Sequence, residues 1–188
     1  ECAHRLQACE DVTLGAIDKD ESRLALIDQN LQRIGSQANF RQVQLKCGNA
    51  TQPSDWHDGA LFDRILADVP CSASGVIRRH PDIKLLRRDD DIPNLVLQQQ
   101  AILSALWPLL KPGGVMIYST CSIFKDENEA QIAWFIGNHE NCTVNRLNSV
   151  QWGHKRPYGR QIFPGQHGMD GFYYAKIHKT MMMSGQKG

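Results

Sequence analysis

Two cysteines stand directly after hydrophobic runs, fifty positions apart. Asp68-Val69-Pro70-Cys71 follows Ile65-Leu66-Ala67, and Thr120-Cys121-Ser122 follows the run from Val115 to Ser119. Ligands of open α/β sheets bind at the carboxyl ends of the strands. Either cysteine alone is better explained as a small buried hydrophobe. Two thiols at strand ends, one of them close to a carboxylate, together predict covalent chemistry in one cleft.

The neighbours of the two thiols favour different roles for them. A free cysteine has a pKa of about 8.5, so little of it is thiolate at neutral pH without help. The Asp68 carboxylate, three positions before Cys71, opposes ionisation of that thiol. Cys121 has hydroxyl neighbours and no adjacent acid, which makes it the better nucleophile candidate. Asp68 is suited instead to hydrogen-bonding the amino group and ring nitrogen of a base.

Asp18 ends a short apolar strand just before a helix. In nucleotide-binding α/β folds an acid at this place accepts hydrogen bonds from ribose hydroxyls. The alternative is an acid that favours the dipole of the helix N-terminus. No glycine-rich phosphate loop precedes Asp18. A ligand with a ribose and no pyrophosphate, such as S-adenosylmethionine, therefore fits better than a dinucleotide.

The one concentrated basic segment comes directly after Cys71. It contains Arg78-Arg79-His80, then Lys84 and Arg87-Arg88. The net charge of +1 excludes a globally basic nucleic-acid binder, so any RNA contact must be local. A solvated loop and a phosphate-binding patch are both compatible with such a charge run.

Composition sets the broad class. The 188 residues are 41% hydrophobic and 22% charged, which is typical of one globular domain. No apolar run approaches the roughly 18 residues of a membrane helix, so no membrane partner is expected. The six cysteines include no CxxC pair and no zinc-ligand spacing, so neither a metal site nor a disulfide scaffold is expected. Reduced thiols indicate a cytoplasmic protein.

Strand and helix patterns alternate along the chain, which predicts an α/β fold with a mostly parallel sheet and a closing antiparallel pair. The region from Ser72 to Asp91 shows no clear periodicity, and residues 180–188 are expected to fray. The predicted strands are Val12–Asp18, Phe40–Leu45, a buried central strand Ile65–Ala67, Val115–Ser119, Arg160–Gly165 and Phe172–Ile177. The predicted helices are Glu21–Ile34 with Asp20 as cap and Gly35 as stop, Ile92–Leu110 and Glu127–His139.

Three motifs give the chain a specific resemblance. They are Ala67-Asp68-Val69-Pro70-Cys71-Ser72-Ala73-Ser74-Gly75 followed by Arg78-Arg79-His80-Pro81-Asp82, then Tyr118-Ser119-Thr120-Cys121-Ser122 followed by Glu127-Asn128-Glu129, and Asp170-Gly171-Phe172-Tyr173-Tyr174-Ala175-Lys176. The chain resembles the RNA 5-methylcytosine methyltransferases and is most similar to their Sun/Fmu (RsmB) type, which acts on bacterial 16S ribosomal RNA. DNA cytosine methyltransferases use the Pro-Cys thiol as nucleophile and lack the Thr-Cys-Ser thiol, so the pair favours RNA.

The resemblance implies a Rossmann-like class I methyltransferase fold over residues 1–179, with S-adenosylmethionine as methyl donor. It implies that Cys121 adds to carbon 6 of a cytosine splayed from its stack, that Cys71 assists release of the product, and that Asp68 holds the base. The cofactor contacts it implies are Asp18, Asn49, Asp68 and Pro70. We expect RNA phosphates to meet Arg78, Arg79, His80 and Arg88.

Two departures from the family pattern qualify these expectations. The family's first strand and its Ala-Pro-Gly-Gly-Lys-Thr loop have no counterpart in this sequence, so a chain truncated at its N-terminus with weakened cofactor binding is expected. Gly48-Asn49 stands where the family has a Gly-Asp pair. Three alternatives remain open at this point: a non-catalytic RNA-binding remnant, a methyltransferase acting on transfer RNA, and a thiol hydrolase.

Overall fold

The computed structural model describes residues 12–33, 40, 42–145, 147 and 149–181. The predicted helix end at Ile34 and Gly35 and the tail from residue 182 onward lie outside this range. The chain divides into two compact units, Glu1–Gly59 and Ala60–Gly188, each described here by itself.

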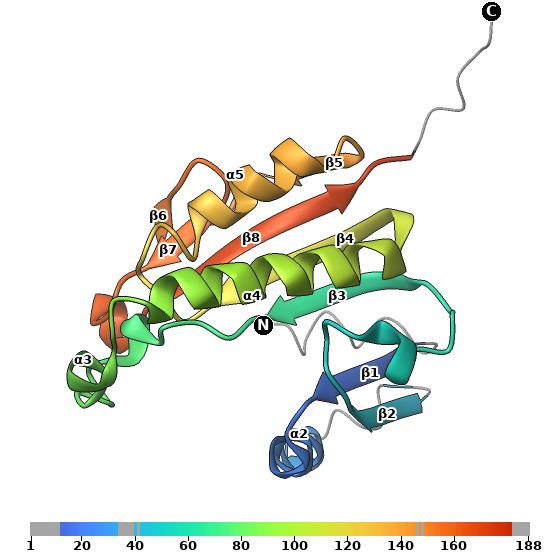
Figure 1. Cartoon of the computed structure of the whole chain (residues 1–188), viewed down its shortest axis with the longest axis horizontal. Coiled ribbons are helices and arrows are strands. Elements are labelled where there is room, and N and C mark those ends of the chain that lie inside the picture. Colours follow the sequence, from blue (N-terminus) through green and yellow to red (C-terminus); the bar gives the residue numbers. More distant parts are fainter. Residues whose placement is uncertain (1–11, 34–39, 41, 146, 148, 182–188) are drawn as a thin grey trace, which may run out of the picture. The chain divides into compact units, whose positions relative to one another are not determined.

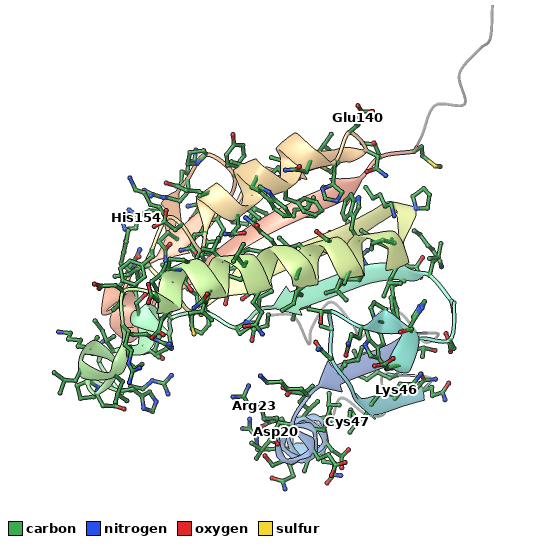
Figure 2. All side chains as sticks on the ribbon, in the orientation of Figure 1. Asp20, Arg23, Lys46, Cys47, Glu140 and His154 are labelled. Atoms are coloured by element: carbon green, nitrogen blue, oxygen red, sulfur yellow. The ribbon has the colours of Figure 1, made fainter. Side chains whose placement is uncertain are left out.

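The first unit contains two parallel strands and the helix between them. Strand β1 (Thr13–Asp18) pairs with β2 (Gln42–Cys47), and helix α2 (Glu21–Arg33) connects them, with a short 3-10 helix η2 (Pro53–Asp55) after β2. The Ser22 amide donates a hydrogen bond to Asp20 Oδ1 at 2.8 Å, which confirms the predicted helix cap. Figure 2 shows Asp20 and Arg23 at this helix and Cys47 at the end of β2.

The second unit contains a six-stranded sheet in the order β3-β4-β8-β7-β6, with β5 also paired to β8 (Figure 1). Its strands are β3 (Phe62–Asp68), β4 (Leu110–Thr120), β5 (Cys142–Asn145), β6 (His154–Lys155), β7 (Arg160–Ile162) and β8 (Phe172–Lys179). Its helices are α3 (Ile83–Leu86), α4 (Asp91–Leu106) and α5 (Glu129–Asn138), with 3-10 helices η3 (Ser74–Val76), η4 (Trp107–Leu109) and η5 (Gln166–Gly168).

The predicted α/β fold is confirmed, and the six-stranded sheet of the second unit is mixed. The pairs β1–β2 and β3–β4 are parallel. Strands β5, β6, β7 and β8 are joined by antiparallel pairs, so the closing antiparallel part is larger than one strand pair. The core lies between this sheet and helices α4 and α5. Tyr173, Ala175 and Ile177 alternate along β8 with their side chains buried, and Leu103 and Phe135 are buried on the two helices.

Two predicted elements differ in the structure. Helix α4 ends at Leu106, and Leu110 is the first residue of β4, because the backbone is extended there. Residues Lys111–Gly114 form an irregularity in the pairing of β4 with β3. Among the described strands, β3 pairs with β4 alone and so lies at the edge of its sheet instead of the centre. Leu66 is 69% exposed, whereas Ala67, on the opposite face, is buried.

Candidate active site

The ends of β3 and β4 bring the two thiols together. Asp68 pairs with Ser119 in the parallel register, and the Val69 amide donates to the Ser119 carbonyl at 3.1 Å. The chain then turns from each strand into its cysteine. Cys71 Sγ and Cys121 Sγ lie 3.4 Å apart, and both are free, half-buried thiols. Two residues fifty positions apart therefore form one pair of interacting thiols.

The hydrogen bond between the two thiols shifts their pKa values in opposite directions. The hydrogen bond with Cys121 raises the pKa of the Cys71 thiol, and burial raises it further. The same hydrogen bond lowers the pKa of Cys121, because a thiolate there accepts from Cys71. The charge of Asp68 acts against this and raises the pKa of Cys121. The acid that stands near Cys71 in the sequence thus acts on Cys121 in the structure, which corrects the argument from adjacency.

A buried carboxyl group holds both cysteine turns from behind. Glu127 Oε2 accepts hydrogen bonds from Ser72 Oγ and Ser122 Oγ, each at 2.6 Å. Its Oε1 accepts from the Ser72 amide at 2.7 Å and from Gln99 Nε2 at 3.2 Å. Ser72 and Ser122 each follow a cysteine directly, and all four side chains are buried. One carboxyl group therefore fixes the residue after each thiol.

A second set of buried polar groups extends this support. Asn128 accepts from Thr120 Oγ1 at 2.6 Å and donates to the Ser122 carbonyl at 2.9 Å. Gln161 Nε2, on β7, donates to the same carbonyl at 3.1 Å. The sequence reasoning assigned no role to Glu127, Asn128, Gln99 or Gln161. The available signal was the polar Glu127-Asn128 pair just behind the second cysteine motif.

Gly75 lets two backbones cross close to the thiols. Its amide donates to the Cys121 carbonyl at 2.8 Å, and its carbonyl accepts from the Gly171 amide at 2.8 Å. A Cβ at this position would lie 2.1 Å from the Gly171 oxygen and 2.8 Å from the Cys121 oxygen. Only glycine fits this crossing without displacing the turn that carries Cys121.

Asp68 and Pro70 lie on the exposed side of the β3 end. The Pro70 carbonyl accepts from Gln99 Nε2 at 3.0 Å, which fixes the turn before Cys71. Arg87 Nε donates to the Ser72 carbonyl at 2.9 Å and holds the same turn from the opposite direction. The Asp68 carboxyl group is thus placed beside the thiol pair on a rigid turn.

The structure separates the predicted phosphate-binding residues into two groups. Arg79 pairs with the Asp170 carboxylate, so its charge is already compensated. Arg78, His80 and Arg88 have exposed side chains, and within the described part of the chain no ion pair engages Arg78 or Arg88. Of the three predicted phosphate-binding arginines, Arg78 and Arg88 therefore carry the charges that no described ion pair compensates.

Asp18 and Asn49 lie at neighbouring strand ends in the first unit. The Gly48 amide donates to the Asp18 carbonyl at 3.0 Å. Asp18 Oδ1 accepts from the Asp20 amide at 2.9 Å, and Asn49 Oδ1 accepts from the Thr51 amide and hydroxyl at 3.0 and 2.9 Å. Oxygen acceptors at adjacent carboxyl ends suit the hydroxyls and amino group of an adenosine, so the residues present fit that part of the expected cofactor.

Over the described ranges, no group of three or more His, Cys, Asp or Glu side chains is placed to hold a metal ion. Among the described helices, none has the length and apolar character needed to cross a membrane.

Comparisons with known proteins identify the family of the chain. The family described as 16S rRNA methyltransferase RsmB/F matches residues 3–178. Ribosomal RNA small subunit methyltransferase B of Erwinia tasmaniensis is 47% identical over 94% of this chain and 39% of its own length, and that of Vibrio cholerae is 47% identical over 94% and 38%. The chain thus spans about two fifths of these relatives.

Solved structures show the same fold. A methyltransferase homologue from Pyrococcus horikoshii has a TM-score of 0.70 at 30% identity, over 89% of this chain and 53% of its own. NSun6 from Pyrococcus horikoshii has a TM-score of 0.74 at 24% identity, over 95% and 51%. With the family match over nearly the whole sequence, the chain belongs to the 16S rRNA methyltransferase RsmB/F family.

Proposed function

We propose that this chain is the catalytic part, over residues 1–179, of a cytoplasmic enzyme that methylates carbon 5 of a cytosine in small-subunit ribosomal RNA. The observation that carries the proposal is the thiol pair, with its sulfur atoms 3.4 Å apart and the pKa of Cys121 lowered by the bond from Cys71. The names of the relatives, ribosomal RNA small subunit methyltransferase B, support the substrate class.

In the proposed reaction the Cys121 thiolate adds to carbon 6 of the cytosine. The new sulfur–carbon bond makes carbon 5 electron-rich. S-adenosylmethionine, when bound, supplies the methyl group that carbon 5 takes. Asp68 hydrogen-bonds the amino group and ring nitrogen of the base and so holds the ring in place. Release then follows with the assistance of Cys71: carbon 5 gives up its proton to a base, the freed electron pair reforms the double bond, and Cys121 leaves carbon 6 as a thiolate.

The other site residues have binding roles in this proposal. Asp18 and Asn49 hold the adenosine part of the cofactor, and Asp68 and Pro70 border its methyl-donating end. Arg78, His80 and Arg88 contact RNA phosphates, and Arg79 contributes less charge because Asp170 already pairs with it.

One observation favours a different function. Asn49 stands where the resemblance expects an acid, and its side-chain oxygen already accepts two hydrogen bonds from Thr51. A domain that binds RNA and has lost its cofactor fits this feature.

A covalent trap separates the two functions. RNA carrying 5-fluorocytosine accepts the methyl group but has no carbon 5 proton to lose, so the enzyme stays bonded to carbon 6. We expect the full-length protein to form a denaturant-stable RNA adduct with S-adenosylmethionine present. Cys121→Ala should abolish it, whereas the buried Cys142, outside the site, serves as a matched control and Cys142→Ala should retain it. Absence of any adduct would favour the RNA-binding remnant.

A further inference from the structure

A cavity of about 580 Å³ lies on the second unit, and the proposed reaction does not use it. Its aromatic wall consists of Phe172 and Tyr174 on β8, and its charged wall contains Arg78 and the Arg79–Asp170 pair. Met169 and Ile162 close its sides. This size and mixed lining are typical of small-ligand sites.

The aromatic wall consists of two nearly parallel rings. The Phe172 and Tyr174 rings lie 6.0 Å apart with an interplanar angle of only 16°. The edge of Trp152 packs against Tyr174 at 5.6 Å, which fixes the orientation of that ring. Both wall residues are half-buried, so their rings are held by the sheet and still reach the cavity. Base–aromatic stacking needs such a rigid, accessible ring face.

The charged wall supplies one free cation. The guanidinium of Arg79 is compensated by Asp170, whereas within the described residues no ion pair engages Arg78. The Arg78 Nη1 atom lies over the Gly165 turn, 3.7 Å from where a Cβ of that glycine would be, at the rim of the cavity. An aromatic platform with one free positive charge at its rim matches one nucleotide, with its base stacked and its phosphate at the arginine.

Backbone hydrogen bonds connect this cavity to the nucleophile. Gly171, next to the lining residues Asp170 and Phe172, donates to the Gly75 carbonyl, and Gly75 donates to the Cys121 carbonyl, both at 2.8 Å. Two bonds therefore separate the cavity wall from the turn that presents Cys121. A nucleotide held here lies close to the base that reacts with the thiol.

We propose that this cavity binds an unpaired nucleotide flanking the target cytosine. The identity of the target cytosine rests on the proposed function. The base of the flanking nucleotide stacks on the wall formed by Phe172 and Tyr174, and Arg78 binds its phosphate. It makes the enzyme selective for cytosines whose neighbour can leave its stack, as in a loop or bulge.

An abasic scan tests the proposal. A short single-stranded RNA with one cytosine is bound to the full-length protein, and each neighbouring nucleotide is replaced in turn by an abasic residue. One position should lower the affinity at least about fivefold, the effect of losing one stacked base. Phe172→Leu and Tyr174→Leu should abolish the sensitivity at that position only. Phe163→Leu, an exposed aromatic outside the cavity lining, should keep it.

Met169→Glu provides a test that does not touch the sheet. Met169 is 40% exposed and lines the cavity, so a carboxylate there repels the phosphate and leaves the fold unchanged. This variant should also lose the position-specific sensitivity. An unchanged scan in all three cavity variants overturns the proposal, including the case in which a protein rather than RNA occupies the cavity. The 5-fluorocytosine adduct is read separately: adduct with an unchanged scan refutes only the cavity, and an altered scan without adduct refutes only the methyltransferase.

Discussion

The two groups of candidate site residues, one in each unit, lie at similar places in their own sheets and are built in opposite ways. The thiol pair stands at the ends of β3 and β4, and the residue after each cysteine is fixed by the buried Glu127, far away in the sequence. Asp18 and Asn49 stand at the ends of β1 and β2, and their side chains contact residues close by in the sequence: Asp18 accepts from the Asp20 amide and pairs with Arg23, and Asn49 accepts from Thr51. The reacting groups are therefore preset by the core, whereas the cofactor-binding groups depend on local turns.

Of the changes proposed here, removing Glu127 should destabilise the protein most. Glu127→Ala removes the acceptor of the Ser72 and Ser122 hydroxyls, the Ser72 amide and one Gln99 proton in a buried place. The two hydroxyls keep only longer contacts, at 3.1–3.2 Å, with each other and with Ser74. Each lost acceptor costs about 1–3 kcal/mol, so we expect at least about 3 kcal/mol of destabilisation in urea unfolding. The exposed Glu140 is the matched control, and Glu140→Ala should change stability by less than about 0.5 kcal/mol. Equal stabilities of the two variants would contradict the role of Glu127 in fixing the two cysteine turns.

Gly75→Ala should come next in size. The new methyl group would meet the Gly171 and Cys121 carbonyls at 2.1 and 2.8 Å, and such overpacking costs about 1–3 kcal/mol. Gly137 on α5 has nothing within 4 Å of an added Cβ. Gly137→Ala should therefore stabilise the protein by about 0.5–1 kcal/mol. Thermal unfolding of the two variants measures both signs, and destabilisation by both would show that crowding at Gly75 is not the cause.

The sequence predicts the strand ends well and the groups behind them poorly. Apolar runs that stop at Asp68 and Cys121 place both thiols at one edge of a sheet, because parallel strands end together. Glu127 gives no such signal, since its partners lie up to 55 positions away and an acid before a helix ordinarily faces solvent. Its burial depends on the tertiary structure alone.

Two errors of boundary and burial have the same origin. Leu110 continues the helical spacing of α4 in the sequence, yet pairing with β3 makes it the first residue of β4. Ile65-Leu66-Ala67 is continuous and apolar, which is typical of a central strand. Leu66 is nevertheless exposed, whereas Ala67, whose side chain points to the opposite face of the sheet, is buried. Within the described residues β3 also has a sheet partner on one side only. The pattern of one segment does not show which other elements pack against it, and these elements determine both the start of β4 and the exposure of Leu66.

A smaller effect concerns the thiol proton, and its sign distinguishes the two neighbours of Cys121. Cys71→Ala removes the hydrogen bond that lowers the pKa of Cys121, so its alkylation by iodoacetamide should move to higher pH. Asp68→Asn removes a charge that raises the same pKa, so alkylation should move to lower pH. Peptide mapping of alkylated Cys121 across pH measures both. Shifts in the same direction would refute the described proton sharing.

The smallest effect on stability is expected at Asn49, in the first unit. Asn49→Asp keeps an oxygen acceptor for both Thr51 donors, so unfolding free energy should change by less than about 0.5 kcal/mol. The restored charge should strengthen a hydrogen bond to the adenosine by about 1 kcal/mol, or roughly fivefold in affinity. Calorimetric titration of the full-length protein with S-adenosylhomocysteine checks this. Unchanged affinity would remove Asn49 from the cofactor site.

The division of labour between the thiols is the central claim, and covalent trapping on unmodified RNA tests it most directly. In the full-length protein, Cys71→Ala should still add to the base and methylate it but release it slowly. A protein–RNA band stable to denaturant should therefore accumulate with S-adenosylmethionine and cytosine-containing RNA. Cys121→Ala should form no band and no product. A band from Cys121→Ala and none from Cys71→Ala would reverse the two roles and contradict the account.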